Sequence, residues 1–237
     1  MLQTNISILS TRPLPEPVIE EAAQQGIAID VESFIETEAI QTIAVQQEIE
    51  QALLQSAVII FTSMNAVEAV ASFMTEEMPD WIIYCMGQTT QELVKTYFGA
   101  ASIAGTASNA AELADLVLEE NDINEVIFFC GDQRRDELPE MLLSNDVAVN
   151  EIVVYQTIAT PRRIKKEYNG ILFFSPSAVD SFFVKNKPGK HTTLFAIGNT
   201  TTAAIRKHSS NSIITSDKPG KERLLEKAIN YFVNNER

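Results

Sequence analysis

The stretch IIFTSMNAV at Ile59–Val67 returns as ILFFSPSAV at Ile171–Val179, and 171 − 59 places the second copy 112 positions after the first. In each copy, an apolar run typical of a buried strand reaches a serine and continues as a helical pattern. A second pair, MGQTT at Met86–Thr90 and IGNTT at Ile197–Thr201, is separated by 197 − 86, or 111, positions. Solenoid repeats have periods of about 20 to 50 residues. The longer period therefore indicates a duplicated domain.

The duplication extends beyond these two motifs. The opening segment also recurs, because Ala28–Thr37 aligns with Ala148–Thr157 at a shift of 148 − 28, or 120, positions. Two different shifts mean that two interleaved segments are each present twice. Two assemblies fit this order: a tandem pair of domains, or an exchanged form in which the middle of the chain makes one domain and both ends make the other. The periodicity alone favours the tandem order.

Short runs of β-branched and aromatic residues alternate with helical patterns, which is typical of parallel α/β architecture. Predicted strands lie near 6–10, 28–35, 57–61, 82–86, 101–104, 126–130, 147–155, 171–174, 194–197 and 213–215. Predicted helices lie at 65–73, 90–98, 110–118, 138–143, 178–184, 201–207 and 221–232. The fold class is therefore α/β, with two similar domains that each hold a five-stranded parallel sheet flanked by helices.

Composition restricts the classes of protein to which the chain can belong. Its 237 residues suffice for two domains, and 18 basic against 32 acidic residues give a net charge of −14, which argues against a nucleic-acid partner. The N-terminus has neither a signal-peptide pattern nor an apolar run long enough to span a membrane, so a cytoplasmic protein is expected. Cys85 and Cys130 lack metal-type spacing and are expected to be core residues. No nucleotide-cofactor or metal-hydrolase motif occurs.

Donor-rich turns follow six of the predicted strands. They are Ser10-Thr11-Arg12, Thr62-Ser63, Gly87–Thr90, Gly131–Arg135, Ser175-Pro176-Ser177 and Gly198–Thr201. Any one of them is explained by helix capping, since Ser and Thr satisfy free N–H groups at helix starts. Six together, at the strand ends where α/β proteins bind ligands, indicate a site for carboxylates or phosphates. Asp132 and Asp136 are expected to be ion-paired or solvated beside Arg134 and Arg135.

Tyr155 differs from these residues because it lies within a predicted strand between the domains. An aromatic residue there is often a packing residue. Tyr155 would instead face a ligand if the strands connect the two domains. The pattern leaves both interpretations open.

Taken in order, these segments resemble the uroporphyrinogen-III synthase family. The resemblance rests on FTSMNAV at Phe61–Val67, MGQTT at Met86–Thr90, Cys130-Gly131 followed by Arg134, Arg135 and Leu138-Pro139, VYQT at Val154–Thr157, FSPSAV at Phe174–Val179, and AIGNTT at Ala196–Thr201. They run in the family's order across nearly the whole chain.

The resemblance implies the exchanged assembly. One domain would take residues 1–34 and 159–237, the other would take 38–151, and segments 32–37 and 151–158 would form a two-strand ladder between them. It also implies a reaction: linear hydroxymethylbilane loses its hydroxyl as water and closes to uroporphyrinogen III with inversion of ring D. No metal and no organic cofactor are implied.

The resemblance also implies roles for individual residues. The tetrapyrrole would lie in a cleft between the domains, held largely by main-chain amides, and Tyr155 would protonate or orient the departing hydroxyl. The implied substrate-binding residues are Arg12, Ser63, Asn65, Thr89, Thr90, Gly131, Arg134, Ser175, Ser177, Thr200 and Thr201. Asn65 departs from the family pattern, since many members have a basic residue at this position.

The leading hypothesis is therefore a monomeric enzyme of tetrapyrrole biosynthesis with a linear tetrapyrrole as its small-molecule substrate. Transient contacts with neighbouring enzymes of the pathway are compatible with it. An alternative is a non-catalytic, two-lobed module that binds anions or regulates another protein on the same fold. A nucleotide-sugar transferase is disfavoured by the size of the chain and by the missing sugar-nucleotide motifs.

Overall fold

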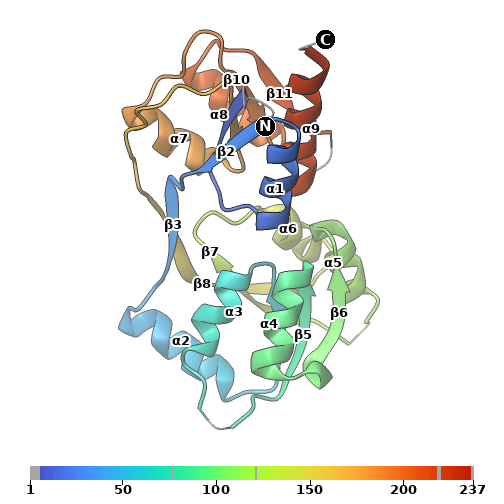
Figure 1. The fold of residues 1–237 in the computed structure, drawn as a ribbon. Helices are drawn as coiled ribbons and strands as arrows, with labels where there is room; N and C mark the ends of the chain where they lie inside the picture. Colours follow the sequence, from blue (N-terminus) through green and yellow to red (C-terminus); the bar gives the residue numbers. More distant parts are fainter. Residues whose placement is uncertain (1–5, 76, 121, 218–219, 236–237) are drawn as a thin grey trace. The chain divides into compact units, whose positions relative to one another are not determined.

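The computed structural model describes residues 6–75, 77–120, 122–217 and 220–235, and its ribbon is drawn in Figure 1. The chain divides into two compact units. Unit 1 takes the residues up to Glu36 and from Ile158 onward, and unit 2 takes Thr37–Thr157. Unit 1 is thus built from both ends of the chain. The tandem order that the periodicity favours is therefore wrong.

Among its described residues, unit 1 has a five-stranded parallel sheet in the order β11-β10-β9-β1-β2. The strands are β1 (Ile6–Ser10), β2 (Ile27–Val31), β9 (Gly170–Phe173), β10 (Thr193–Ala196) and β11 (Ile213–Thr215). The helices are α1 (Glu16–Gln24), α7 (Pro176–Lys185), α8 (Asn199–His208) and α9 (Lys221–Asn235). Neighbouring strand residues point to opposite faces. Leu172 accordingly packs with α1 and α9, whereas Ile171 and Phe173 pack with α7 and α8.

Unit 2, apart from residues 76 and 121, has a sheet in the order β3-β8-β7-β4-β5-β6, and the five strands from β8 to β6 are parallel. The strands are β3 (Ile35–Ala39), β4 (Ala57–Phe61), β5 (Trp81–Met86), β6 (Ile103–Ala107), β7 (Glu125–Gly131) and β8 (Ala148–Ala159). The helices are α2 (Ile43–Leu53), α3 (Met64–Ala71), α4 (Gln88–Phe98), α5 (Ala110–Leu118), α6 (Glu137–Leu143) and the 3₁₀ turn η1 (Ala100–Ser102). Both units have the predicted α/β architecture.

The repeated motif supplies the centre of each sheet. In unit 2, Ile59 and Phe61 pack into one core cluster and Ile60 packs into the cluster on the opposite face. All three side chains are fully buried. Burying a side chain of this size stabilises the fold by roughly 1.5–3 kcal/mol. The same alternation in both copies explains why a continuous apolar run marks a strand that is covered on both faces.

Strands β3 and β8 pair along the segments in which the chain passes between the units. The N–H of Thr160 donates to the carbonyl of Phe34 at 2.9 Å, and the N–H of Ile40 donates to the carbonyl of Val154 at 2.9 Å. Residue numbers rise along one strand as they fall along the other, so the pair is antiparallel. β8 therefore serves both as a strand of the sheet of unit 2 and as a connecting strand.

Two details of the predicted elements are corrected. The strand predicted near 28–35 is interrupted, because residues 32–34 separate β2 from β3 and lie outside any strand. Helices α1 and α2 are absent from the predicted set. α1 fully buries only Ala22, and α2 fully buries only Ile49 and Ala52.

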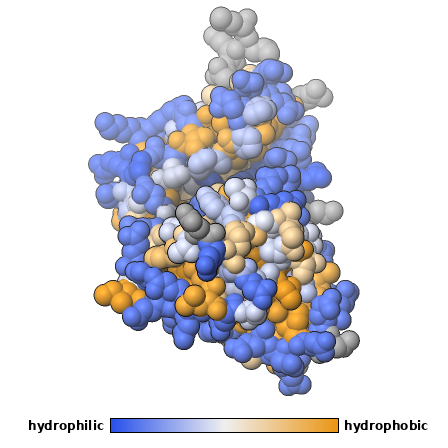
Figure 2. Space-filling view, turned by 90° about the horizontal axis from the view of Figure 1, so that it is seen from below, coloured by the Kyte–Doolittle hydropathy of each residue, from blue (hydrophilic) through white to orange (hydrophobic). Residues whose placement is uncertain are grey.

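Exposed apolar side chains occur at several separate positions. Figure 2 shows apolar patches on one face, surrounded by hydrophilic side chains. The large exposed apolar residues include Ile43, Leu54, Met78, Ile82, Leu143 and Val184. Single exposed apolar residues are common on folded proteins and do not by themselves indicate a binding surface.

Candidate active site

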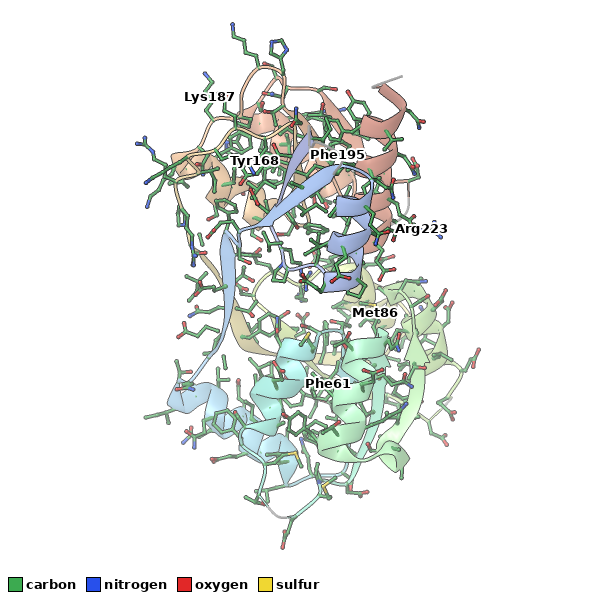
Figure 3. The ribbon with its side chains drawn as sticks, in the orientation of Figure 1. Phe61, Met86, Tyr168, Lys187, Phe195 and Arg223 are labelled. Carbon is green, nitrogen blue, oxygen red and sulfur yellow. The ribbon has the colours of Figure 1, made fainter. Side chains whose placement is uncertain are left out.

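The donor-rich turns lie at the carboxyl ends of the parallel strands in each unit. In unit 2 they follow β4, β5 and β7, and Figure 3 labels Phe61 and Met86, the last residues of β4 and β5. In unit 1 they follow β1, β9 and β10. Parallel strands place their carboxyl ends on one edge of the sheet, where α/β proteins bind ligands. We call these edges the donor edge of unit 1 and the donor edge of unit 2.

The two serine turns are occupied by helix capping. The Oγ of Ser63 accepts from the N–H of Asn65 at 3.2 Å at the start of α3. The Oγ of Ser175 accepts from the N–H of Ala178 at 3.2 Å at the start of α7, and it lies 3.1 Å from the Oγ of Ser177. Capping explains these serines locally. A ligand at α3 or α7 would compete with an existing hydrogen bond.

The glycine turns at Gly87 and Gly198 differ from the turns at Ser63 and Ser175, because no side chain caps the helix that follows each of them. α4 begins after Gly87 and α8 begins after Gly198, and at neither start does a side chain of the cap residue accept a hydrogen bond from the first N–H groups of the helix. Gly87 has φ = 89°, a left-handed conformation that residues with a Cβ rarely adopt. Unsatisfied N–H groups together with the helix dipole favour an anion at such an end. The structure thus separates capped serine turns from glycine turns with available amides.

The threonines of the two glycine turns fall into two classes. Thr90 and Thr201 are buried, with exposed fractions of 5% and 1%. Thr89 and Thr200, the preceding residues, are exposed. In each turn, therefore, the hydroxyl of the first threonine is accessible to a ligand and that of the second is buried.

Tyr155 lies against Gly131, which ends the neighbouring strand β7. An irregularity after Cys130 shifts the register: Cys130 pairs with Val153, but Gly131 pairs with Tyr155 and not with Val154. A Cβ at position 131 would lie 2.3 Å from Cζ and 2.7 Å from the hydroxyl oxygen of Tyr155. Tyr155 is half-buried and also packs against the apolar cluster around Phe61. Gly131 thus allows a close approach that any side chain would prevent.

Asp132 holds the backbone of β8 at Tyr155 and at Thr157. Its N–H donates to the carbonyl of Tyr155 at 3.1 Å, and its Oδ1 accepts from the N–H of Thr157 at 2.9 Å. The expectation that Asp132 is ion-paired or solvated misses this role. Its position directly after Gly131, at a strand end, is a signal in the sequence that such a contact is possible.

Arg134 is already engaged by acidic side chains. Its Nη2 donates to Oε1 of Glu151 at 2.8 Å, its Nε contacts the other oxygen of Glu151, and its Nη1 pairs with Asp136. A carboxylate of a ligand would have to compete with both acids. Asp136 was expected to be ion-paired or solvated, and the structure shows it ion-paired with Arg134.

Arg12 and Lys221 supply positive charge on the donor edge of unit 1. Thr11 secures the turn after β1, since its Oγ1 donates to the carbonyl of Leu172 at 2.7 Å, and Arg12 follows with an exposed side chain. Loss of solvent and the positive charge of Arg12 both lower the pKa of the Lys221 ammonium, so the two cations lie near each other. Neither side chain forms an ion pair with any residue that the structure describes. Lys221 is absent from the predicted site, although its place at a helix start after a strand could have indicated it.

Some other chemistries find no support in the described part of the chain. Burial raises the pKa of both thiols, Cys85 and Cys130, to about 11, so neither is a ready thiolate nucleophile. Both cysteines are free and buried. Among the described residues, no group of three or more His, Cys, Asp or Glu side chains is arranged to hold a metal ion. No described helix is both long enough and apolar enough to cross a membrane.

Comparison with known proteins gives one consistent family. A family model described as uroporphyrinogen-III synthase HemD matches residues 16–226. Uroporphyrinogen-III synthase of Saccharomyces cerevisiae is 26% identical over 203 residues, which cover 71% of this chain and 74% of that protein.

Two solved structures share the fold. Uroporphyrinogen-III synthetase from Helicobacter pylori 26695 aligns with a TM-score of 0.67 at 18% identity, covering 95% of this chain and 99% of that chain. A mutant uroporphyrinogen III synthase from Thermus thermophilus aligns with a TM-score of 0.61 at 12% identity, covering 98% and 100%. Because the family model spans most of the sequence, the chain belongs to the uroporphyrinogen-III synthase family.

Proposed function

We propose that this protein is a lyase of tetrapyrrole biosynthesis that converts hydroxymethylbilane to uroporphyrinogen III. The linear substrate loses its hydroxyl as water and closes into a macrocycle with ring D inverted. The match of the family model across residues 16–226 is the observation that carries this proposal. The two uncapped glycine turns and the close contact of Tyr155 with Gly131 are consistent with it.

The substrate is rich in carboxylates, because every pyrrole ring has an acetate and a propionate arm. We infer that these arms bind to the donor edge of each unit. The amides at the starts of α4 and α8 are the strongest candidates, since no side chain caps them. The hydroxyls of Thr89 and Thr200 add donors beside them. Ser63, Asn65, Ser175 and Ser177 would contribute at the starts of α3 and α7 by exchanging a capping bond for a bond to substrate.

Tyr155 is the candidate for proton transfer. Its phenol would donate a proton to the departing hydroxyl as the carbon–oxygen bond breaks, so that water leaves. The closed ring loses one proton when its last pyrrole regains aromaticity, and this proton restores the phenol. Hydroxymethylbilane loses its hydroxyl easily. The protein's main task is therefore to bend the linear substrate until ring A meets the substituted carbon of ring D.

Arg12 and Lys221 would bind carboxylate arms as a pair of cations. Replacing both with Gln is expected to raise KM about tenfold or more with little change in kcat, because binding is lost and the protonating group is retained. Steady-state kinetics on hydroxymethylbilane measure this split. The matched control is Arg206→Gln with Lys207→Gln, which removes the same amount of charge from the last turn of α8, away from the donor edge. Equal effects in both double variants would show that only the overall charge of the protein matters.

We also infer that the enzyme acts as a monomer in the cytoplasm. Two free, buried thiols are compatible with a reducing compartment. Sedimentation at several concentrations tests the monomer, and a second species at working concentration would contradict it.

Analysis of the product tests the proposed function directly. The protein is added to freshly generated hydroxymethylbilane, and the isomers are separated after oxidation to porphyrins. The type III isomer is expected to dominate when the protein is present. The reaction without protein provides the reference for the type I isomer, in which ring D is not inverted. If only type I accumulates, the protein is not a uroporphyrinogen-III synthase, and the non-catalytic anion-binding module becomes the better account.

A further inference from the structure

Positive charge is concentrated in one part of unit 1, and the proposed reaction uses none of the cations found there. Residues 162–190 contain seven Lys or Arg and two acidic residues, a net charge of +5. The whole chain carries −14, so all other residues together carry −14 − 5, or −19. A basic region in a strongly acidic protein concentrates anions locally.

This basic region surrounds a cavity of about 260 Å³. The cavity lies among the segments that precede β9 and β10, and therefore at the edge of the sheet opposite the donor edge of unit 1. Leu9, Ile171 and Phe182 form its apolar floor. Figure 3 labels Lys187 and Tyr168, which both line the cavity. We call it the basic cavity.

Four cations around the basic cavity have no acidic partner. Arg163, Lys165, Lys185 and Lys187 line it, and none of them forms an ion pair within the part of the chain that the structure describes. Lys166 is different, since its Nζ bonds to Oδ2 of Asp30 at 2.7 Å. The hydroxyl of Tyr168 donates to the same oxygen at 2.7 Å.

Hydrogen bonds hold the walls of the basic cavity in place. Asn186 joins the end of α7 to the segment before β9: its Nδ2 donates to the carbonyls of Arg162 and Phe182 at 2.7 and 2.9 Å, and its Oδ1 accepts from the N–H of Ile164 at 2.7 Å. The Oγ1 of Thr192 donates to the carbonyl of Tyr168 at 2.8 Å. A preformed site loses little entropy when it binds a ligand.

Only one of these four cations has a position that is explained by stabilising its own helix. Lys185 lies in the last turn of α7, where a positive charge favours the helix dipole. Arg163 and Lys165 come from a segment without regular structure, and Lys187 follows the end of α7. Like charges brought together at a cavity repel one another and cost stability unless an anion is bound.

We propose that the basic cavity binds a small polyanion, a molecule with two or more phosphate or carboxylate groups, through Arg163, Lys165, Lys185 and Lys187. The guanidinium of Arg163 suits bidentate contact with either group, and the lysines act as point charges. Glu167, the one acidic side chain in the lining, leaves the lining with a net positive charge. The apolar floor accommodates the carbon skeleton of such a ligand. A cavity of this volume fits a small molecule better than a folded partner.

Calorimetric titration of the full chain tests this proposal without any turnover assay. Inorganic tripolyphosphate and citrate serve as the phosphate and carboxylate probes. At least one is expected to bind with one-to-one stoichiometry and to bind more weakly as salt increases. The double variant Lys185→Gln with Lys187→Gln is expected to weaken binding about tenfold or more. Tighter binding of one probe identifies the anionic group that the cavity prefers.

Two double variants with the same loss of charge serve as controls. Arg206→Gln with Lys207→Gln changes cations that do not line the cavity, and Arg12→Gln with Lys221→Gln changes the donor edge. Both are expected to leave the affinity within about twofold of the wild type. Equal weakening by the first control, selective weakening by the second, or no binding of either probe would overturn the proposal. Binding of an acidic polypeptide such as polyglutamate, with neither small probe bound, would also overturn it in favour of a protein partner. Thermal melting of each variant checks that it is folded.

Discussion

A Tyr155→Phe variant is expected to form uroporphyrinogen III about 10 to 100 times more slowly than the wild type while remaining folded. General acid catalysis by a positioned side chain contributes about 10²- to 10⁴-fold in many enzymes. The expected effect lies at or below the lower end of this range because the hydroxyl of the substrate leaves easily. The phenyl ring keeps the contact with Gly131 and with the cluster around Phe61, so only the hydroxyl is lost. Single-turnover rates and the ratio of type III to type I product measure the effect.

Tyr97→Phe is the matched control, since Tyr97 is exposed on α4 and also loses only a hydroxyl. Its turnover is expected to equal that of the wild type. Unchanged turnover in Tyr155→Phe would remove the phenol from the mechanism and leave Tyr155 with a packing role. A slow variant that still makes only type III product would separate proton transfer from the folding of the substrate.

The strands were predictable because their sequence pattern depends on burial. Residues such as Ile59, Ile60 and Phe61 are covered on both faces, so they form continuous apolar runs that mark a parallel strand. Helices α1 and α2 were not predictable in the same way. Each fully buries at most two side chains, and α1 follows Pro15, which provides no side-chain cap.

The donor turns were predictable as a class, but their differences were not. The turns at Ser63 and Ser175 and the turns at Gly87 and Gly198 look alike in the sequence, because each follows the end of a strand and precedes a helix. Only the structure distinguishes the serines, whose hydroxyls cap their own helices, from α4 and α8, whose first amides have no side-chain partner. Capping depends on side-chain direction, which residue type alone does not determine.

Contacts between distant residues were the least predictable feature. Arg134 was a candidate for binding the substrate, but Glu151, 17 positions away, engages its guanidinium. Gly131 was a candidate hydrogen-bond donor to the substrate, but the ring of Tyr155 occupies the space where its side chain would lie. Both contacts depend on the pairing of β7 with β8 and on the irregularity after Cys130. No local pattern specifies such a register.

The contact between Gly131 and Tyr155 predicts a second large effect. Gly131→Ala is expected to destabilise the protein by about 1–3 kcal/mol, the usual cost of adding a methyl group to a filled site. It is also expected to lower activity at least as much as Tyr155→Phe, because a ring 2.3 Å from the new Cβ must move. Urea unfolding measures the first effect, and the assay of type III product measures the second.

Gly189→Ala is the matched control for this change, since the nearest atom to a Cβ at position 189 is 3.5 Å away and no movement is required. A double-mutant cycle isolates the contact itself. In a Tyr155→Ala background the ring is absent, so the cost of Gly131→Ala should fall by more than about 0.5 kcal/mol, the largest change expected of uncoupled sites. If Gly131→Ala costs the same with and without the ring, the glycine serves the strand irregularity and not the tyrosine. If Gly131→Ala has a cost only when the tyrosine ring is present, the absence of a side chain at position 131 is what allows Tyr155 to occupy its place.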